Sequence, residues 1–224
     1  MRFARRLLAT TFAVASLTAA AHAAPAASVE IYDGITYAQF KAALTATKLT
    51  ITEKATTKGT KYLLIALPGL AMPIAATTMD CDKGQDQPCE GFTYLYLDEK
   101  NAMDATATSQ FNRDYGFVKA MPSAGNDTLG VIQGEFYARG GVSENNVRMA
   151  GAYVSAVTLT YMQKNAPTAM NGAPSAQALL MSRPADADKF FADLTARNAG
   201  RPLPPASVPV AAEALIDAAN ARGH

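Results

Sequence analysis

Apolar residues recur at helical spacing near the start of the chain. Tyr37, Phe40 and Leu44 follow one another at intervals of three and four, which places them on one face of a helix. Thr36 stands immediately before them, and its hydroxyl can accept from the free amides of a first helical turn. The pattern therefore predicts a helix over 37–48.

A longer apolar stripe follows Gly140-Gly141-Val142-Ser143 and predicts a helix with Ser143 as its N-cap. Its positions repeat at three and four: Val147, Ala150, Val154, Val157 and Tyr161. A second stripe widens the apolar surface: Met149, Tyr153, Ala156 and Thr160. The second stripe is either additional core or a candidate partner surface, for another protein or for a second copy of the chain.

Between these helices the period changes to two, which is typical of strands. Predicted strands cover 49–53, 62–67, 73–79, 91–97, 117–121 and 128–138, and a short helix covers 104–112. In the fourth strand Phe92, Tyr94 and Tyr96 alternate with other residues, so the aromatic rings line one face. Gly125-Asn126-Asp127 predicts the turn of a hairpin. We therefore expect an α+β domain over 29–164, with an antiparallel sheet and helices packed on one face.

The chain changes character at Asn165. Residues 165–224 are rich in alanine and proline, with two helix-like pieces over 187–196 and 210–221. The interrupted periodicity predicts a C-terminal tail with marginal helices. Docking of these helices against the domain is the alternative.

The first residues have the pattern of an export signal. Arg2, Arg5 and Arg6 precede an apolar run, and Ala21-His22-Ala23 supplies the small residues of a cleavage site. This predicts a signal peptide over 1–23 and a periplasmic or secreted protein. The run is shorter than the roughly 20 residues that span a bilayer, so no membrane span is expected.

Removal of this leader leaves 17 of the 20 basic residues against 19 acidic ones, a net charge of −2. A small, mixed charge does not suit nucleic acid, which requires a concentrated basic face. About 200 residues remain, enough for one domain with a sizeable core.

Cys81 and Cys89 are the only two cysteines and flank a polar loop, CDKGQDQPC. In an oxidising compartment such a pair is expected to form a disulfide. A redox-active pair is the alternative, although the spacing lacks the tight motif that lowers a thiol pKa.

Internal histidines are absent, because His22 leaves with the leader and His224 is the last residue. Catalytic sets built on histidine are therefore unavailable, as is a zinc site of the usual Cys/His type. No metal site and no cofactor are predicted.

Two sets of polar residues can each be interpreted in two ways. Asn112, Arg113 and Asp114 form either a binding cluster or a local cap with an ion pair. Asp80, Asp82 and Asp86 either surround a cation or form a solvated loop, and their spacing lacks the glycine and distal glutamate of a calcium loop.

The order of these features resembles the YbjN domain family. The likeness covers about 36–164 and is most specific at Phe111-Asn112-Arg113 and at Gly140-Gly141-Val142-Ser143. It implies a fold similar to type III secretion chaperones and a role as a bacterial sensory transduction regulator. Family members usually have Trp-Asn where this chain has Phe111-Asn112, and a tryptophan in the long helix, whereas this chain contains no tryptophan. The family has no established catalytic residues to transfer.

We therefore expect a protein without enzymatic activity that binds a protein or peptide partner in a chaperone-like or regulatory role. The alternative is a periplasmic module that binds a small ligand or an ion. A third interpretation, an enzyme using carboxylates alone, would require two buried acids about 5–10 Å apart.

Overall fold

The computed structural model describes residues 30–47, 49–68, 70–98, 104–121, 130–165, 203–208 and 210–221, with 189, 191–193 and 196. The helices are α1 (Tyr37–Thr45), α2 (Ala105–Asp114), α3 (Glu144–Asn165) and α6 (Val210–Asn220). The strands are β1 (Thr50–Ala55), β2 (Lys61–Ala66), β3 (Ile74–Met79), β4 (Gly91–Asp98), β5 (Val118–Met121) and β6 (Gly130–Tyr137). The predicted leader over 1–23 and most of the predicted helix over 187–196 lie outside the described residues.

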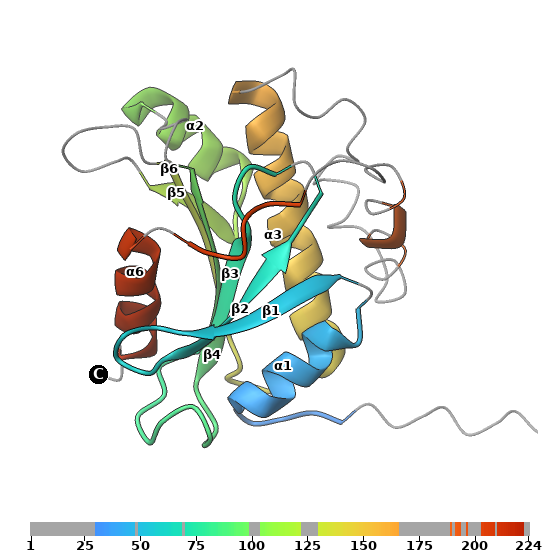
Figure 1. The fold of residues 1–224 in the computed structure, drawn as a ribbon, viewed down its shortest axis with the longest axis vertical. Helices are drawn as coiled ribbons and strands as arrows, with labels where there is room; N and C mark the ends of the chain where they lie inside the picture. The colour runs from blue at the N-terminus through green and yellow to red at the C-terminus, as the bar shows by residue number, and fades with distance from the viewer. Residues whose placement is uncertain are drawn as a thin grey trace, which may run out of the picture.

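The six strands form one antiparallel sheet in the order β1-β2-β3-β4-β6-β5 (Figure 1). The first four strands follow one another as a meander. The chain then passes through α2 and forms β5 at the sheet edge, and β6 returns between β4 and β5. The predicted α+β fold with an antiparallel sheet is confirmed.

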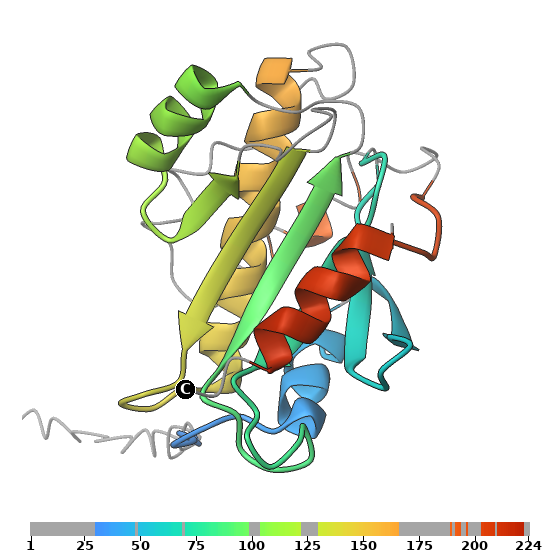
Figure 2. The same ribbon diagram turned by 90° about the vertical axis from the view of Figure 1, so that its left-hand side faces the viewer.

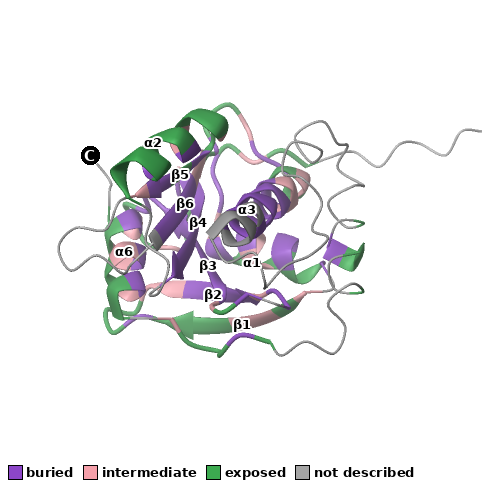
Figure 3. Cartoon of the chain, turned by 90° about the horizontal axis from the view of Figure 1, so that it is seen from above, coloured by how far each residue is buried: buried purple, intermediate pink, exposed green. Residues whose placement is uncertain are grey.

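The first face of the sheet carries the main core and is covered by α1 and α3. Phe92, Tyr94 and Tyr96 all project from β4 into this core, as their alternation predicted. The predicted stripe of α3, from Val147 to Tyr161, is buried there as well. Figure 3 shows α1 and α3 together on this side of the sheet.

α3 lies very close to the sheet at Gly134 of β6. A Cβ at this position would lie 2.7 Å from Cγ2 of Val154, too close for the two atoms to coexist without a shift. Only glycine therefore lets β6 and α3 approach to this distance. This close approach sets the depth at which the long helix sits on the first face.

The second face is covered in part by α6, which lies outside the predicted domain over 29–164. Within that domain α1 and α3 share one face, as expected, whereas residues 210–220 form a helix docked on the other face, the alternative to a tail of marginal helices (Figure 2). Ala212 and Ile216 pack against apolar residues of β2, β3, β4 and β6, and Ala219 is buried as well. Two alanines and Ile216, at spacings of four and three, make a narrow apolar stripe, which lets an alanine-rich helix pack closely against the sheet.

Local signals at the helix starts agree with the predictions. The hydroxyl of Thr36 accepts from the amide of Gln39, whose side-chain oxygen accepts from the Thr36 amide in return. Ser143 forms the same reciprocal pair with Asn146 at the start of α3. These caps satisfy amides that have no partner inside the helix.

Cys81 and Cys89 form a disulfide, as predicted, with an S–S distance of 2.02 Å. Within the loop that it closes, the Gln85 side chain lies between β2 and β3. It accepts from the Lys61 amide at 2.7 Å and donates to the Lys61 carbonyl at 2.9 Å. The loop is thereby attached to the sheet by side-chain as well as covalent links.

Candidate functional site

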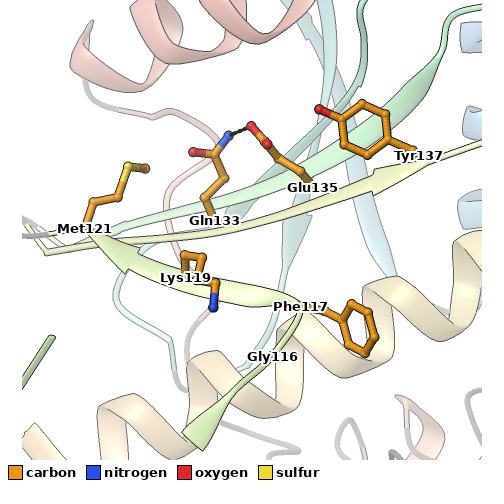
Figure 4. Close-up of a pocket in the computed structure, with 7 residues that line it drawn as sticks. All are labelled: Gly116, Phe117, Lys119, Met121, Gln133, Glu135 and Tyr137. Carbon is orange, nitrogen blue, oxygen red and sulfur yellow. Dashed lines mark hydrogen bonds between the residues drawn. The ribbon is translucent and has the colours of Figure 1, made fainter. Parts of the chain in front are cut away.

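A pocket of about 410 Å³ opens on the second face, over β5 and β6 and beside the part of the sheet that α6 covers. We call it the β5–β6 pocket. Figure 4 shows its lining residues, which are Gly116, Phe117, Lys119, Met121, Gln133, Glu135 and Tyr137.

The strand period and the pairing register bring these side chains together. Gln133, Glu135 and Tyr137 occupy alternate positions of β6, so they project from the same face of the sheet (Figure 4). Lys119 is paired directly with Gln133 across β5 and β6, and Met121 with Val131. A shift of the β6 register by one residue would turn the side chains of Gln133, Glu135 and Tyr137 toward the core on the first face.

The floor of the pocket is polar and held in place. Nε2 of the buried Gln133 donates to Oε1 of Glu135 at 2.9 Å. Its distance to the Thr93 hydroxyl is 3.5 Å, and that hydroxyl donates to the Gly134 carbonyl at 3.0 Å. At one side, the Lys119 ammonium donates to the Asn112 carbonyl at 3.3 Å. The floor thus presents an amide and a carboxylate joined by a hydrogen bond, with a lysine ammonium at its side.

Two aromatic rings stand at the rim with much of their surface in solvent. Phe117 is 66% exposed and Tyr137 is 56% exposed. The Phe117 ring points toward α3, where its centroid lies 6.5 Å from that of Tyr153 in an edge-on arrangement (Figure 4). Large exposed aromatic side chains beside a hollow are typical of interaction sites.

The predicted partner surface on α3 does not form an exposed face, and this expectation is corrected. Ala156 is fully buried and Tyr153 is 6% exposed. Met149 is partly buried against the first-face core, and the side chain of Thr160 lies outside the described part of the chain. α1 packs along α3, and Phe117 contacts Tyr153, so the second stripe is core.

The predicted cluster of Asn112, Arg113 and Asp114 lies in the last turn of α2, where Asn112 bonds to β5 and the other two share Gln110 as a partner. The Asn112 side chain accepts from the Ala120 amide at 2.8 Å and donates to the Ala120 carbonyl at 3.0 Å. Arg113 donates to Gln110, which in turn donates to Asp114. Asn112 therefore completes the edge of β5 in place of a further strand.

The three aspartates near the disulfide do not converge. Asp80 is buried beside the end of α6, whereas Asp86 is exposed and pairs with Lys61 at 3.1 Å. Within the described residues, no three histidine, cysteine or acidic side chains gather closely enough to hold a metal ion.

Buried tyrosines gather at one end of the first face, near the end of β4. Burial, and then the neighbouring Asp98 carboxylate, raise the pKa of Tyr161 to about 12. Burial also raises the pKa of Tyr96, with Asp98 contributing next. Asp98 itself is 3% exposed, so a molecule in solvent does not reach this group. The tyrosines stay neutral at neutral pH and are structural.

Chemically, the β5–β6 pocket can hold a ligand by hydrogen bonds, by charge and by contact with aromatic and thioether groups. Its seven lining residues include no serine, threonine, cysteine or histidine.

The sequence did not predict this site, because the site depends on which strand lies beside β6. The available signal was the alternation of Gln133, Glu135 and Tyr137 along one strand, with polar groups where a fully covered face would be apolar.

Comparison of the chain with protein-family models, with curated proteins and with solved structures gave no match. The resemblance to the YbjN family stays a prediction.

None of the helices in the described ranges has the length and hydropathy needed to cross a membrane.

Proposed function

We propose that the chain is an exported, non-catalytic binding protein that holds a peptide segment of a partner protein in the β5–β6 pocket. The observation that carries the proposal is the exposure of Phe117 and Tyr137 at the rim of a pocket with a fixed polar floor. Interfaces are enriched in aromatic residues and methionine, and a few such residues supply most of the binding energy.

The pocket chemistry describes the segment that it would accept. The Glu135 carboxylate is negatively charged and accepts from Gln133, so the pocket would favour an amide or a cationic donor of the bound segment. An apolar side chain of the partner would lie against Met121 and the Tyr137 ring. The polar floor would then select the register of the bound segment, while the apolar contacts supply affinity.

Export is supported by the leader pattern and by the disulfide. Disulfides persist in oxidising compartments and are rare in the cytosol. A chaperone-like or regulatory role is what the resemblance to the YbjN family implies, and a pocket that binds a partner segment is compatible with it.

The test uses a random 12-residue peptide library selected on the full mature chain, followed by calorimetry with the selected peptides. We expect Tyr137→Ala and Phe117→Ala each to weaken binding at least tenfold. Ile31→Ala is the control, because Ile31 is a comparably exposed apolar residue that does not line the pocket. Peptides that bind the pocket variants as tightly as the unsubstituted chain would contradict the proposal.

A small-ligand module is the second candidate, because the volume of about 410 Å³ falls in the range of small-molecule sites. Thermal denaturation across a panel of metal ions and periplasmic metabolites separates the two. A ligand at 100 times its Kd stabilises the chain by about 2.7 kcal/mol, so tight binding must raise the melting temperature. A rise that Tyr137→Ala abolishes would favour this second function.

A further inference from the structure

The side-chain amide of Gln133 has a polar atom without a protein partner at the floor of the β5–β6 pocket. Its nitrogen Nε2 donates to Oε1 of Glu135 at 2.9 Å and lies 3.5 Å from the Thr93 hydroxyl. No group in the described ranges donates to its oxygen Oε1, although the residue is only 9% exposed. A buried amide oxygen normally has a hydrogen-bond donor. Here a molecule inside the pocket would supply it.

The orientation of this amide follows from its partners. A carboxylate at neutral pH only accepts hydrogen bonds, so the Gln133 atom that faces Glu135 is the nitrogen. The Thr93 hydroxyl donates to the Gly134 carbonyl at 3.0 Å, so it also presents its oxygen to Nε2. Oε1 is thereby turned away from Glu135 (Figure 4). The pocket floor therefore presents two acceptors on neighbouring same-face positions of β6, an amide oxygen and a charged carboxylate.

The ammonium of Lys119, the one cation among the seven lining residues, is directed elsewhere. It donates to the Asn112 carbonyl at 3.3 Å, in the last turn of α2, where the helix dipole places partial negative charge. Figure 4 shows the Lys119 nitrogen pointing away from Gln133 and Glu135. The part of the floor that β6 forms is therefore rich in acceptors and negatively charged.

Apolar groups stand at both ends of the acceptor pair. Met121 lies on the side of Gln133, and the Tyr137 ring lies on the side of Glu135 (Figure 4). Tyr137 is 56% exposed, so its ring is accessible to a ligand. A planar guanidinium stacks on an aromatic ring and is more weakly hydrated than an ammonium. It also carries five N–H donors, enough to reach both acceptors.

We propose that the segment bound in the β5–β6 pocket carries an arginine, whose guanidinium donates to Oε1 of Gln133 and to the Glu135 carboxylate and stacks on Tyr137. The inference rests on the proposed function and narrows the partner to a protein with an exposed segment that contains arginine. Glu135 selects the charge of the bound side chain. Gln133 selects a side chain with more than one donor.

The first test changes one position of the ligand. Each 12-residue peptide selected on the full mature chain is synthesised with its arginine, with citrulline, which has nearly the same shape but no charge, and with lysine. Calorimetry should show citrulline weakening binding about tenfold or more, because a hydrogen bond to a charged group is lost, and lysine should lie between the two. Selection without enrichment of arginine, or equal affinity for the arginine and citrulline peptides, would overturn the proposal.

The second test uses Glu135→Gln, which removes the charge and keeps an oxygen that can accept from Gln133. The preference for arginine over citrulline should fall to about twofold or less, because the charged partner is gone. Glu90→Gln is the control: Glu90 is a part-exposed acid that pairs with Arg139 and does not line the pocket, so the preference should persist. An unchanged preference in Glu135→Gln would contradict the role of Glu135.

Gln133→Met tests the second acceptor at nearly constant volume. It should bring the affinities for the arginine and lysine peptides within about twofold, because one acceptor no longer distinguishes the number of donors. The melting temperature shows whether the variant is folded. If it is not, the three peptides on the unsubstituted chain decide the proposal.

The inference and the proposed function fail in different ways. Peptides that require Tyr137 but bind equally well with citrulline would overturn the arginine and leave peptide binding standing. Peptides that bind Tyr137→Ala as tightly as the unsubstituted chain would overturn the function itself. N-acetyl-arginine amide, titrated alone, checks the other source of a guanidinium: an affinity equal to that of the peptides would identify a small molecule and overturn the assignment to a partner protein.

Discussion

The hydroxyl of Tyr94 donates a 2.8 Å hydrogen bond to the backbone carbonyl of Val147, which ties the middle of β4 to the first turns of α3. Both residues are fully buried. Gly151, one turn further along the helix, leaves room for this hydroxyl: a Cβ there would lie 3.1 Å from it. The contact therefore depends on Tyr94 and on two residues of α3 that lie far from it in the sequence.

Tyr94→Phe should lower the free energy of unfolding by about 1 kcal/mol, because it removes the hydrogen bond and little of the packing. For a chain of this size the melting temperature should fall by about 2–4 °C. Calorimetry measures both quantities. Tyr137→Phe removes a hydroxyl from an exposed ring and should change stability by less than about 0.5 kcal/mol. Equal effects of the two substitutions would show that the buried bond contributes nothing.

Asn112→Ala should lower the free energy of unfolding by about 1–2 kcal/mol, since two hydrogen bonds to the Ala120 backbone are lost. The Ala120 amide should also exchange faster with solvent. Urea denaturation and hydrogen exchange test both expectations. Arg113→Ala, at the next position of α2, is the control and should have little effect. An unchanged Ala120 amide would contradict the assigned role of Asn112.

Stability should fall as the pH rises from about 10 to about 12, in part through Tyr62. Burial, and then Glu213, raise the pKa of Tyr62 from 10.0 to about 12. The unfolded chain loses this proton first, so the stabilisation is complete below pH 10 and is lost as the pH passes through the folded-state pKa. Urea denaturation between pH 9 and 12 should therefore give a shallower decline for Tyr62→Phe than for the unsubstituted chain. An equal decline in the free energy of unfolding for the two proteins would contradict the raised pKa of Tyr62.

Replacing both cysteines by alanine should lower the free energy of unfolding by about 2–3 kcal/mol on the chain-entropy model, because the bond closes a short loop. Denaturation of the double variant, compared with the oxidised unsubstituted chain, measures this. The reduced unsubstituted chain is the control and should behave like the double variant. A double variant as stable as the oxidised chain would show that the Gln85 bonds alone fix the loop.

Periodicity predicted the elements whose burial is decided locally. Val147, Val154 and Tyr161 face the core because their spacing of three and four places them on one apolar face of α3. Phe92 and Tyr96 share a face for the same reason, since strand side chains alternate. Capping by Thr36 and Ser143 was predictable because a cap acts within three residues of its own position.

What the sequence did not reveal depends on non-local neighbours. The spacing of Tyr153 left it either in the core or on a partner surface, and contacts from elsewhere in the chain decide that it is buried. The docking of α6 depends on apolar side chains of β2, β3, β4 and β6, which no local pattern connects to residues 210–220. The β5–β6 pocket likewise requires the strand order that places β6 inside the sheet and β5 at its edge.

The Asn112 side chain bonds to the Ala120 backbone, so the two edges of the sheet, β5 and β1, differ in their open backbone groups. At β5 the outward backbone groups of Ala120 already have partners, whereas among the described residues no strand pairs with the outer edge of β1. A strand from another molecule would therefore add at β1. In two copies joined through β1, the Ala120 groups at each β5 edge would still be bonded to Asn112, which disfavours further growth of the sheet at that edge.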